Sequence, residues 1–195
     1  MRLLSIEGFV MESPIESSCP VCGVDDSLKM IVHTTQIAYF GEHTQITLSC
    51  DNCGLKQTDF IPAEGKKPGV WTLELTNPNH LNARVVRGSN CTIKIPELDL
   101  GVFPGIHSSG YVSNIEGVIK RFEDAIKITK NQFTDNEIEE IEKCDVLLET
   151  LKSVVNGVFT IALTIIFSDP MGHSKILHDD ATFKKLTQEE IEELL

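Results

Sequence analysis

The chain has 195 residues and a formal net charge of −12, and its residues are 41% hydrophobic and 24% charged. This balance predicts a globular protein with a core, and so acidic a chain is poorly suited to bind phosphate backbones. The most apolar run, residues 158–167, is half as long as the roughly 20 residues that a membrane-spanning helix needs. We expect a soluble, cytoplasmic protein that binds neither nucleic acid nor membrane.

The first third of the chain is expected to form a small finger domain. Residues 1–12 are predicted to be an N-terminal lead segment, and residues 13–63 are rich in cysteine and β-branched residues. Between two cysteine pairs, residues 30–40 and 44–49 have the composition of strands, with Gly41 in the turn. These features predict a β-hairpin that carries the cysteines at its ends.

Residues 64–195 are predicted to form a second, β-rich domain. Its expected strands are residues 70–76, 83–86 and 91–95, separated by turn-forming residues, and later residues 158–167. Strands and helices are segregated along the chain rather than alternating. We therefore predict the α+β class, mainly β, rather than a doubly wound sheet.

A helical hairpin is predicted at about residues 114–156. The apolar stripe of the first helix consists of Ile115, Val118, Ile119, Phe122 and Ile126. A capping pair, Thr134 and Glu137, is expected to start the second helix. The short connection favours antiparallel packing. A last short helix is expected after Thr187, which has Glu190 as its capping partner.

Four cysteines have the spacing of a metal site. Two C-x-x-C-G turns occur, Cys19–Gly23 and Cys50–Gly54, and 27 residues lie between Cys22 and Cys50. The glycines let the backbone curl so that amides point at the thiolates. Four thiolates suit one structural Zn²⁺, because zinc accepts a closed tetrahedron of sulfur ligands. The predicted ligands are Cys19, Cys22, Cys50 and Cys53.

Other chemistry is possible for the same cysteines. Iron held by four thiolates has the same spacing, and a purified sample's colour would distinguish it. A thioredoxin-like pair would need a single C-x-x-C motif at the start of a helix. Disulfides are disfavoured in an intracellular protein. The two remaining cysteines, Cys91 and Cys144, are interpreted as small buried apolar residues.

The local charge argues against a nucleic-acid-binding finger. Residues 13–62 contain six acids and two bases, namely Glu16, Asp25, Asp26, Glu42, Asp51, Asp59, Lys29 and Lys56. Arg84, Arg87 and Lys94 form either a small basic face or ordinary solvated charge. The acidic stretch 135–149 is either a solvated helix face or a surface that docks a basic partner.

The search for a catalytic motif is negative. No two of the histidines form an H-x-H or H-E-x-x-H pattern, and no nucleophile elbow or phosphate-binding loop occurs. We therefore predict a protein that is not an enzyme.

Several blocks resemble the ZPR-type zinc-finger family. Besides CPVCG and CDNCG, they are HTTQIAYFGE (33–42), LNARVVRGSNCTIKIPELDL (81–100), GYVSNIEGVI (110–119) and SDPMGHSKI (168–176). They follow the family's order and span almost the whole chain. Departures such as Ala38 in place of a usual proline, and His173 in place of asparagine, affect loop details. The single finger resembles the short archaeal form.

The resemblance implies a fold and a partner. The fold would be a zinc-ribbon-like finger followed by a double-stranded β-helix, or jelly-roll-like, domain with an inserted helical hairpin. Family members bind translation elongation factor 1A and are thought to help it fold. We therefore expect this chain to bind and help fold that factor; the alternatives are a nucleic-acid-binding zinc ribbon and an adaptor without chaperone activity.

The tip of the finger hairpin is the predicted contact surface. Ile37, Tyr39 and Phe40 are expected to be exposed there and to touch the protein partner. Packing of the finger against the neighbouring domain is the competing interpretation for the same three residues.

Overall fold

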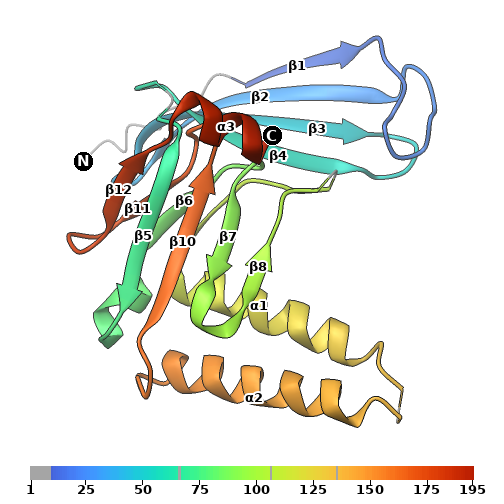
Figure 1. The fold of residues 1–195 in the computed structure, drawn as a ribbon. Helices are drawn as coiled ribbons and strands as arrows, with labels where there is room; N and C mark the ends of the chain where they lie inside the picture. The colour runs from blue at the N-terminus through green and yellow to red at the C-terminus, as the bar shows by residue number, and fades with distance from the viewer. Residues whose placement is uncertain (1–9, 66, 106, 135) are drawn as a thin grey trace, which may run out of the picture.

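The computed structural model describes residues 10–65, 67–105, 107–134 and 136–195. A four-stranded finger sheet lies across one end of a jelly-roll domain, and a hairpin of two long helices packs at the other end of that domain (Figure 1). The strands of the finger run crosswise to those of the jelly roll. The chain is therefore mainly β, as the sequence predicted, with α+β organisation.

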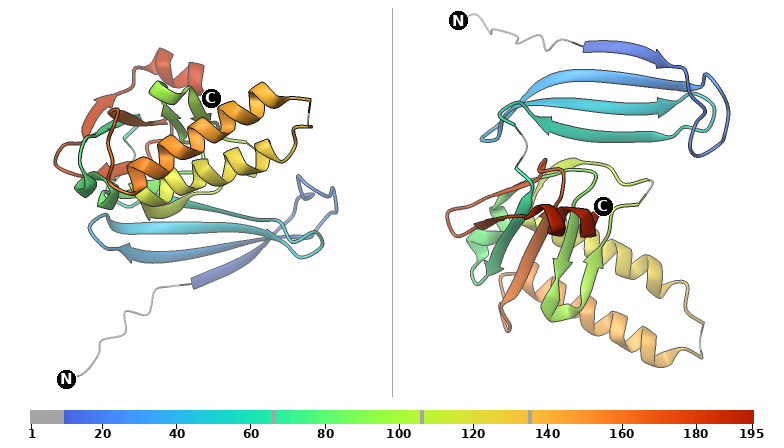
Figure 2. Two further views of the ribbon diagram at one scale, coloured as in Figure 1. Left: turned by 90° about the horizontal axis from the view of Figure 1, so that it is seen from below. Right: turned by 45° about the horizontal axis from the view of Figure 1, so that its top comes forward.

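The finger is an antiparallel meander in the order β1-β2-β3-β4. Its strands are β1 (Val10–Ile15), β2 (Leu28–Ile37), β3 (Gly41–Cys50) and β4 (Lys56–Pro62). The central register pairs Leu28 with Cys50 at one end and Ile37 with Gly41 at the other. This long hairpin puts the cysteine turns at one end and the β2–β3 turn at the other (Figure 2).

The jelly-roll domain consists of two sheets. A five-stranded sheet has the order β12-β5-β10-β7-β8, and a three-stranded sheet has the order β11-β6-β9. The strands are β5 (Gly69–Leu75), β6 (Arg84–Arg87), β7 (Thr92–Ile95), β8 (Leu100–Val102), β9 (Tyr111–Asn114), β10 (Leu163–Asp169), β11 (Lys175–Leu177) and β12 (Thr182–Lys185). Strand β10 lies between β5 and β7, with alternate residues fully buried, as expected for a strand packed on one face.

Three α-helices and two short 3-10 helices complete the fold of the described residues. Their bounds are α1 (Ile115–Lys130), α2 (Ile138–Val155), α3 (Gln188–Leu194), η1 (Pro78–Asn82) and η2 (Pro96–Leu98). The predicted stripe of α1 is buried in the main core together with Leu148 and Leu151 of α2. No helix of the described residues is both long and apolar enough to cross a membrane.

Several element boundaries differ from the prediction. Strand β1 begins at Val10, inside the segment predicted to be a lead; residues 1–9 of that segment lie outside the described residues. The predicted strand at 158–167 is displaced, because β10 begins only at Leu163. Helix α2 begins at Ile138, because Glu137 accepts hydrogen bonds from both the amide and the hydroxyl of Thr134 in a turn that precedes the helix. The capping box of Thr187 and Glu190 is present as predicted.

A tight turn after β10 brings the chain against the linker between the two domains. Gly172 has a φ of +70°, which favours glycine, and its amide donates a hydrogen bond of 3.0 Å to the Asp169 carboxylate. A Cβ at this position would lie 2.3 Å from the Lys67 nitrogen. The carbonyl of Gly172 also accepts a hydrogen bond of 3.2 Å from the Lys67 amide. The turn therefore requires glycine for two reasons, backbone conformation and close approach.

We predict that Gly172→Ala destabilises the protein more than Gly157→Ala. Gly157 has a similar φ of +79°, but a Cβ added there would have Pro78 Cγ as its nearest neighbour, at an ordinary van der Waals distance of 3.5 Å. Gly157→Ala is the control, and its free energy of unfolding should fall by about 1–2 kcal/mol from backbone strain alone. Gly172→Ala should lose more than about 3 kcal/mol, because the backbone of the linker must also move. Urea unfolding in the presence of zinc measures both; equal losses would show that the contact with the linker is unimportant.

Candidate metal centre and the junction of finger and jelly roll

The four predicted cysteines converge at one end of the finger. Their sulfur atoms all lie within 4.8 Å of one another. The separation of Sγ atoms is 3.7 Å between Cys19 and Cys53 and 3.8 Å between Cys22 and Cys50. A tetrahedron of zinc–sulfur bonds of about 2.3 Å has edges of about 3.8 Å. The thiols are thus spaced as one zinc ion requires.

The two cysteine turns repeat the same backbone geometry. The Gly23 amide donates to the Cys19 carbonyl at 2.8 Å, and the Gly54 amide donates to the Cys50 carbonyl at 3.0 Å. Both glycines have a φ near +70°, at +71° and +74°. Glycine is therefore needed at each turn for the backbone to curl around the sulfurs.

The pKa values of Cys50 and Cys53 favour a bound cation. A hydrogen bond with the Ser27 hydroxyl, supported by the Cys53 amide, lowers the pKa of Cys50 to about 6. The Leu55 amide lowers the pKa of Cys53, but desolvation and hydrogen bonds with the other three thiols outweigh it and raise that pKa to about 12. Ionisation of Cys50 is thus favoured and that of Cys53 is opposed by its neighbours; a positive ion at the centre of the quartet would favour the thiolate form of all four.

These observations support one structural Zn²⁺ as the cofactor. Four sulfur donors fill its coordination shell and leave no position for a substrate. When bound, the ion supplies cross-linking of the two turns rather than chemistry. The finger needs this link because, among the described residues, its apolar cluster is small. Cys19, Leu28 and Cys50 are buried, and Ile15, Cys22, Leu48 and Leu55 pack partly buried against them.

A second group of possible ligands, His80, His178 and Asp180, is better explained by hydrogen bonding. The Thr76 amide donates to Nδ1 of His80 at 3.1 Å, so a neutral ring carries its proton on Nε2. Nε2 lies 3.0 Å from an Asp180 carboxylate oxygen, to which it donates. A metal would need the lone pair of Nε2, which this tautomer lacks. The group therefore fastens η1 to the chain before β12.

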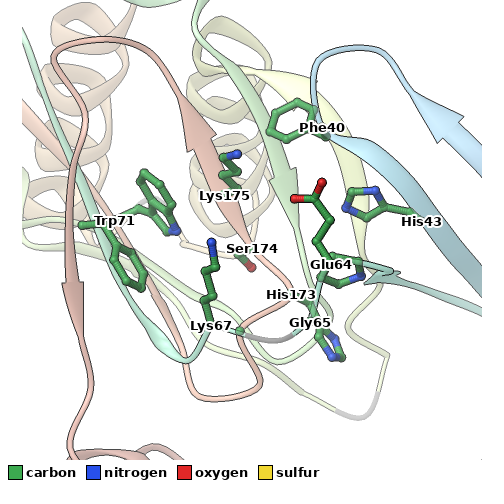
Figure 3. A pocket seen from close by; sticks show the side chains of 12 residues that line it. Phe40, His43, Glu64, Gly65, Lys67, Trp71, His173, Ser174 and Lys175 are labelled. Atoms are coloured by element: carbon green, nitrogen blue, oxygen red, sulfur yellow. The ribbon is translucent and has the colours of Figure 1, made fainter.

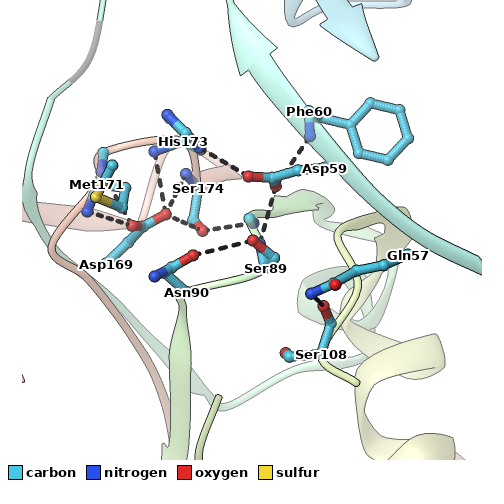
Figure 4. Close-up of polar contacts among 12 residues, drawn as sticks. Gln57, Asp59, Phe60, Ser89, Asn90, Ser108, Asp169, Met171, His173 and Ser174 are labelled. Carbon is cyan, nitrogen blue, oxygen red and sulfur yellow. Dashed lines mark hydrogen bonds and ion pairs between the residues drawn. The ribbon is translucent and has the colours of Figure 1, made fainter. Parts of the chain in front are cut away.

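Polar contacts join the finger to the jelly roll along β4 (Figure 4). Asp59 accepts a hydrogen bond of 2.9 Å from the Ser89 amide, and its other oxygen lies 3.2 Å from Nδ1 of His173. Gln57 donates to the Ser108 carbonyl at 2.8 Å. Burial raises the pKa of Asp59, but the hydrogen bonds from His173 and Ser89 outweigh it and lower the pKa below its ordinary value. Asp59 is therefore held as a carboxylate at the centre of the junction.

The loop that carries His173 is organised by a buried carboxylate. Asp169, which is 1% exposed, accepts hydrogen bonds from the amides of Met171, Gly172, His173 and Ser174. The Ser174 hydroxyl also donates to Asp169 and accepts a 2.8 Å hydrogen bond from the Gly88 amide. This network fixes the turn between β10 and β11 and thereby the ring of His173 that meets the finger.

A small pocket lies beside this junction (Figure 3). Phe40 and His43 of the finger face Trp71, His173 and Lys175 of the jelly roll across it. Its volume of about 180 Å³ is below the 300–1,000 Å³ of typical small-molecule sites, which leaves room for about one side chain. Nε2 of His173 is buried there without a hydrogen-bond partner among the described residues.

The three predicted contact residues have different environments. Tyr39 is 72% exposed at the β2–β3 turn, and Ile37 is half-buried at the end of β2. Phe40 is only 9% exposed, so the expectation that all three are exposed is wrong for Phe40. Its ring faces the pocket because the turn folds back toward Lys175, whose ammonium lies 6.0 Å from the ring centroid.

The basic residues Arg84, Arg87 and Lys94 do not form one face. Arg84 is exposed and Arg87 is 4% exposed, at opposite ends of β6, while Lys94 is exposed on β7. The sequence does not predict the partners of Asp59, which are Ser89 and His173. Their only signal is that they lie in the blocks 81–100 and 168–176, which are far from Asp59 in the chain.

We predict that Cys50→Ser abolishes zinc binding. Removing one sulfur opens the tetrahedron, so the bound metal should fall from about one ion per chain to near zero and the finger should unfold. Cys144→Ala, which changes a buried thiol of α2 outside the quartet, is the control and should retain the metal. Elemental analysis and amide exchange of β2 and β3 measure the two effects; full zinc content in Cys50→Ser would contradict the assignment.

We predict that Asp59→Asn loosens the junction at neutral pH. The stability should fall by about 1–3 kcal/mol, because the Ser89 and His173 donors lose a buried charged acceptor. The folded-state pKa of Asp59 lies below the ordinary 3.8, so its contribution is present above that pH and is lost only as pH falls through the lower value.

The loss of stability caused by Asp59→Asn, measured by urea unfolding relative to the wild type, should therefore be no smaller at pH 5 than at pH 7. Asp145→Asn, which removes an exposed partner of Lys130, is the matched control and should change stability by less than about 1 kcal/mol. An Asp59→Asn variant as stable as this control would show that the junction does not depend on the carboxylate.

Comparison with known proteins identifies the family. Residues 79–194 match the family model of the ZPR1 jelly-roll domain. Uncharacterized ZPR1-like proteins of Methanocaldococcus jannaschii and Pyrococcus horikoshii are each 34% identical, over 94% and 90% of this chain and 91% and 78% of their own lengths. The zinc finger chaperone of Schizosaccharomyces pombe is 26% identical over 83% of this chain, which spans about a third (34%) of that protein. With its four-cysteine finger and jelly roll, the chain belongs to the ZPR1 family of zinc-finger proteins.

Proposed function

We propose that this protein binds a protein client through the tip of its zinc finger and assists the folding of translation elongation factor 1A. The observation that carries the proposal is the conformation of Tyr39. This residue is 72% exposed and has a φ of +72°. A bulky residue rarely adopts this conformation, and such strain is concentrated at binding and catalytic sites.

The surroundings of Tyr39 hold its ring at the surface. The guanidinium of Arg84 lies 4.3 Å from the ring centroid, which stabilises the ring by a cation–π contact. Tyr39 thus makes a contact between the finger and β6 while most of its surface stays in water. An aromatic residue presented in this way is typical of the residues that dominate protein interfaces.

Other features favour a protein ligand over a substrate. The zinc site has no open coordination position, and the neighbouring pocket accommodates about one side chain. The related protein of Schizosaccharomyces pombe is named a chaperone. Elongation factor 1A is the client that the family resemblance implies, and we propose that the protein acts on it in the cytoplasm by binding rather than by catalysis.

The direct test is the refolding of purified elongation factor 1A from denaturant, with and without this protein. A higher yield of active factor with the zinc-loaded protein, and no gain with the zinc-stripped protein, is the expected result. Binding without a gain in yield would leave an adaptor and refute the chaperone role. A gel shift with nucleic acid at physiological salt tests the remaining alternative, and the net charge of −12 predicts no shift.

We predict that Tyr39→Asn weakens client binding without lowering stability. Asparagine tolerates a positive φ, so relief of strain should offset the lost contact with Arg84, which is worth about 0.5–1 kcal/mol. Affinity for the client, measured by surface plasmon resonance, should fall about tenfold or more, as for a hot-spot residue. Val146→Asn, at a 63% exposed position of α2, is the control and should bind normally. Unchanged binding by Tyr39→Asn would remove the finger tip from the mechanism.

A further inference from the structure

Among the residues that the structure describes, Arg84, Arg87 and Arg121 have no carboxylate partner. Acids outnumber bases by 29 to 17, and six lysines form ion pairs, namely Lys29, Lys120, Lys127, Lys130, Lys143 and Lys184. Yet within the described parts of the chain no carboxylate lies within 4.0 Å of Arg84, Arg87 or Arg121. Each of these arginines lies instead against a tyrosine ring.

Two of the three arginines share one ring. The guanidinium of Arg121 lies 4.1 Å from the centroid of Tyr111, and that of Arg87 lies 5.8 Å from it. Arg87 donates to the carbonyls of Ser109 and Cys91 at 2.9 and 2.8 Å, and its Nε has no partner among the described residues. Carbonyl oxygens satisfy donors but do not cancel a charge. A buried cation with no carboxylate within 4.0 Å among the described residues is only partly compensated, and it adds positive potential around Tyr111.

An apolar cleft adjoins these charges. It has a volume of about 590 Å³, and its walls include Ile93, Val102, Phe103, Phe122 and the ring of Tyr111. We call it the Arg121 cleft. Phe103 on its rim is 67% exposed, and the Lys94 ammonium lies 5.7 Å from the Phe103 ring, also without a carboxylate partner among the residues described. The cleft therefore has an apolar floor and a cationic rim.

The apolar surface continues beyond the cleft along α1. Ala125 lines the cleft, and Ile128, three residues later on the same helix, is 63% exposed. Residues three apart share a helix face, so the apolar strip extends by about one turn. A compact metabolite would not use this extension, whereas a peptide segment would.

We propose that the Arg121 cleft binds an acidic segment of a partner protein, with a large apolar side chain on the floor and a neighbouring carboxylate paired with Arg121. Charge complementarity supports this occupant, because the carboxylate supplies the counterion that the chain itself does not provide. The apolar floor and the acidic surface elsewhere disfavour nucleic acid. The inference rests on the proposed binding of a protein client, but it does not depend on Tyr39.

The test uses the zinc-loaded full chain and a fluorescein-labelled peptide, Gly-Ser-Asp-Glu-Phe-Asp-Leu-Glu-Ser-Gly. Fluorescence anisotropy should show binding that weakens about tenfold in Arg121→Glu and also weakens as salt rises from about 50 to 500 mM. Arg84→Glu, which changes an exposed arginine on a different tyrosine, is the matched control and should bind within about twofold of the wild type. Zinc content and circular dichroism confirm that both variants are folded.

Control peptides separate the two parts of the recognition. A peptide with lysine in place of each acid should not bind, and one with serine in place of Phe and Leu should bind about tenfold more weakly. Equal loss in Arg84→Glu, binding of the lysine peptide, or full competition by inorganic phosphate would overturn the proposal. Occupation of the cleft by a second copy of this chain would also overturn the proposal. Sedimentation would show it as a dimer of the wild type that is lost in Arg121→Glu.

The same probe distinguishes this inference from the proposed function. Tyr39→Asn should bind the peptide like the wild type, because Tyr39 contacts Arg84 rather than Arg121. If elongation factor 1A fails to bind but the peptide binds as described, the proposed client is wrong and the proposal for the Arg121 cleft is supported. If the client binds and the peptide does not bind any form of the protein, the cleft proposal fails by itself.

Discussion

The finger depends on four sulfur atoms that all lie within 4.8 Å of one another, a spacing that suits one zinc ion. The buried cluster of the finger contains two of these cysteines and one leucine, so apolar burial contributes little to its stability. The jelly roll, by contrast, has an extended core in which strands of both sheets pack against α1 and α2. The metal thus stabilises the part of the molecule that presents Tyr39, and the core stabilises the part that carries the Arg121 cleft.

Charged and polar groups connect the two parts at their junction. Asp59 reaches from β4 to His173, which is itself placed by the buried carboxylate of Asp169. Hydrogen bonds are directional, so this junction fixes how the finger is oriented as well as how firmly it is attached. The close contact between Gly172 and Lys67 adds a steric limit at the same point. The orientation matters because it brings Tyr39 over Arg84.

Strand β6 connects the two surfaces for which we propose partners. Arg84 at one end of this strand lies against Tyr39 of the finger, and Arg87 at the other end lies against Tyr111 beneath the cleft. In both places an arginine is matched with an aromatic ring although acidic residues are abundant elsewhere. Carboxylates beside Arg87 and Arg121 would neutralise the charge. Because none lies within 4.0 Å of them among the described residues, the cleft stays attractive to acidic groups of a partner.

The sequence by itself determined the features that depend on short spacing: the zinc ligands, the stripe of α1 and the capping box at Thr187. It also gave the family and hence the fold. Only the tertiary structure decided the burial of Phe40, the late start of β10 and the pairing of Asp59 with His173, which are 114 residues apart. Periodicity and capping act within a few residues and leave a local pattern, whereas contacts between distant segments exist only once the sheets have formed.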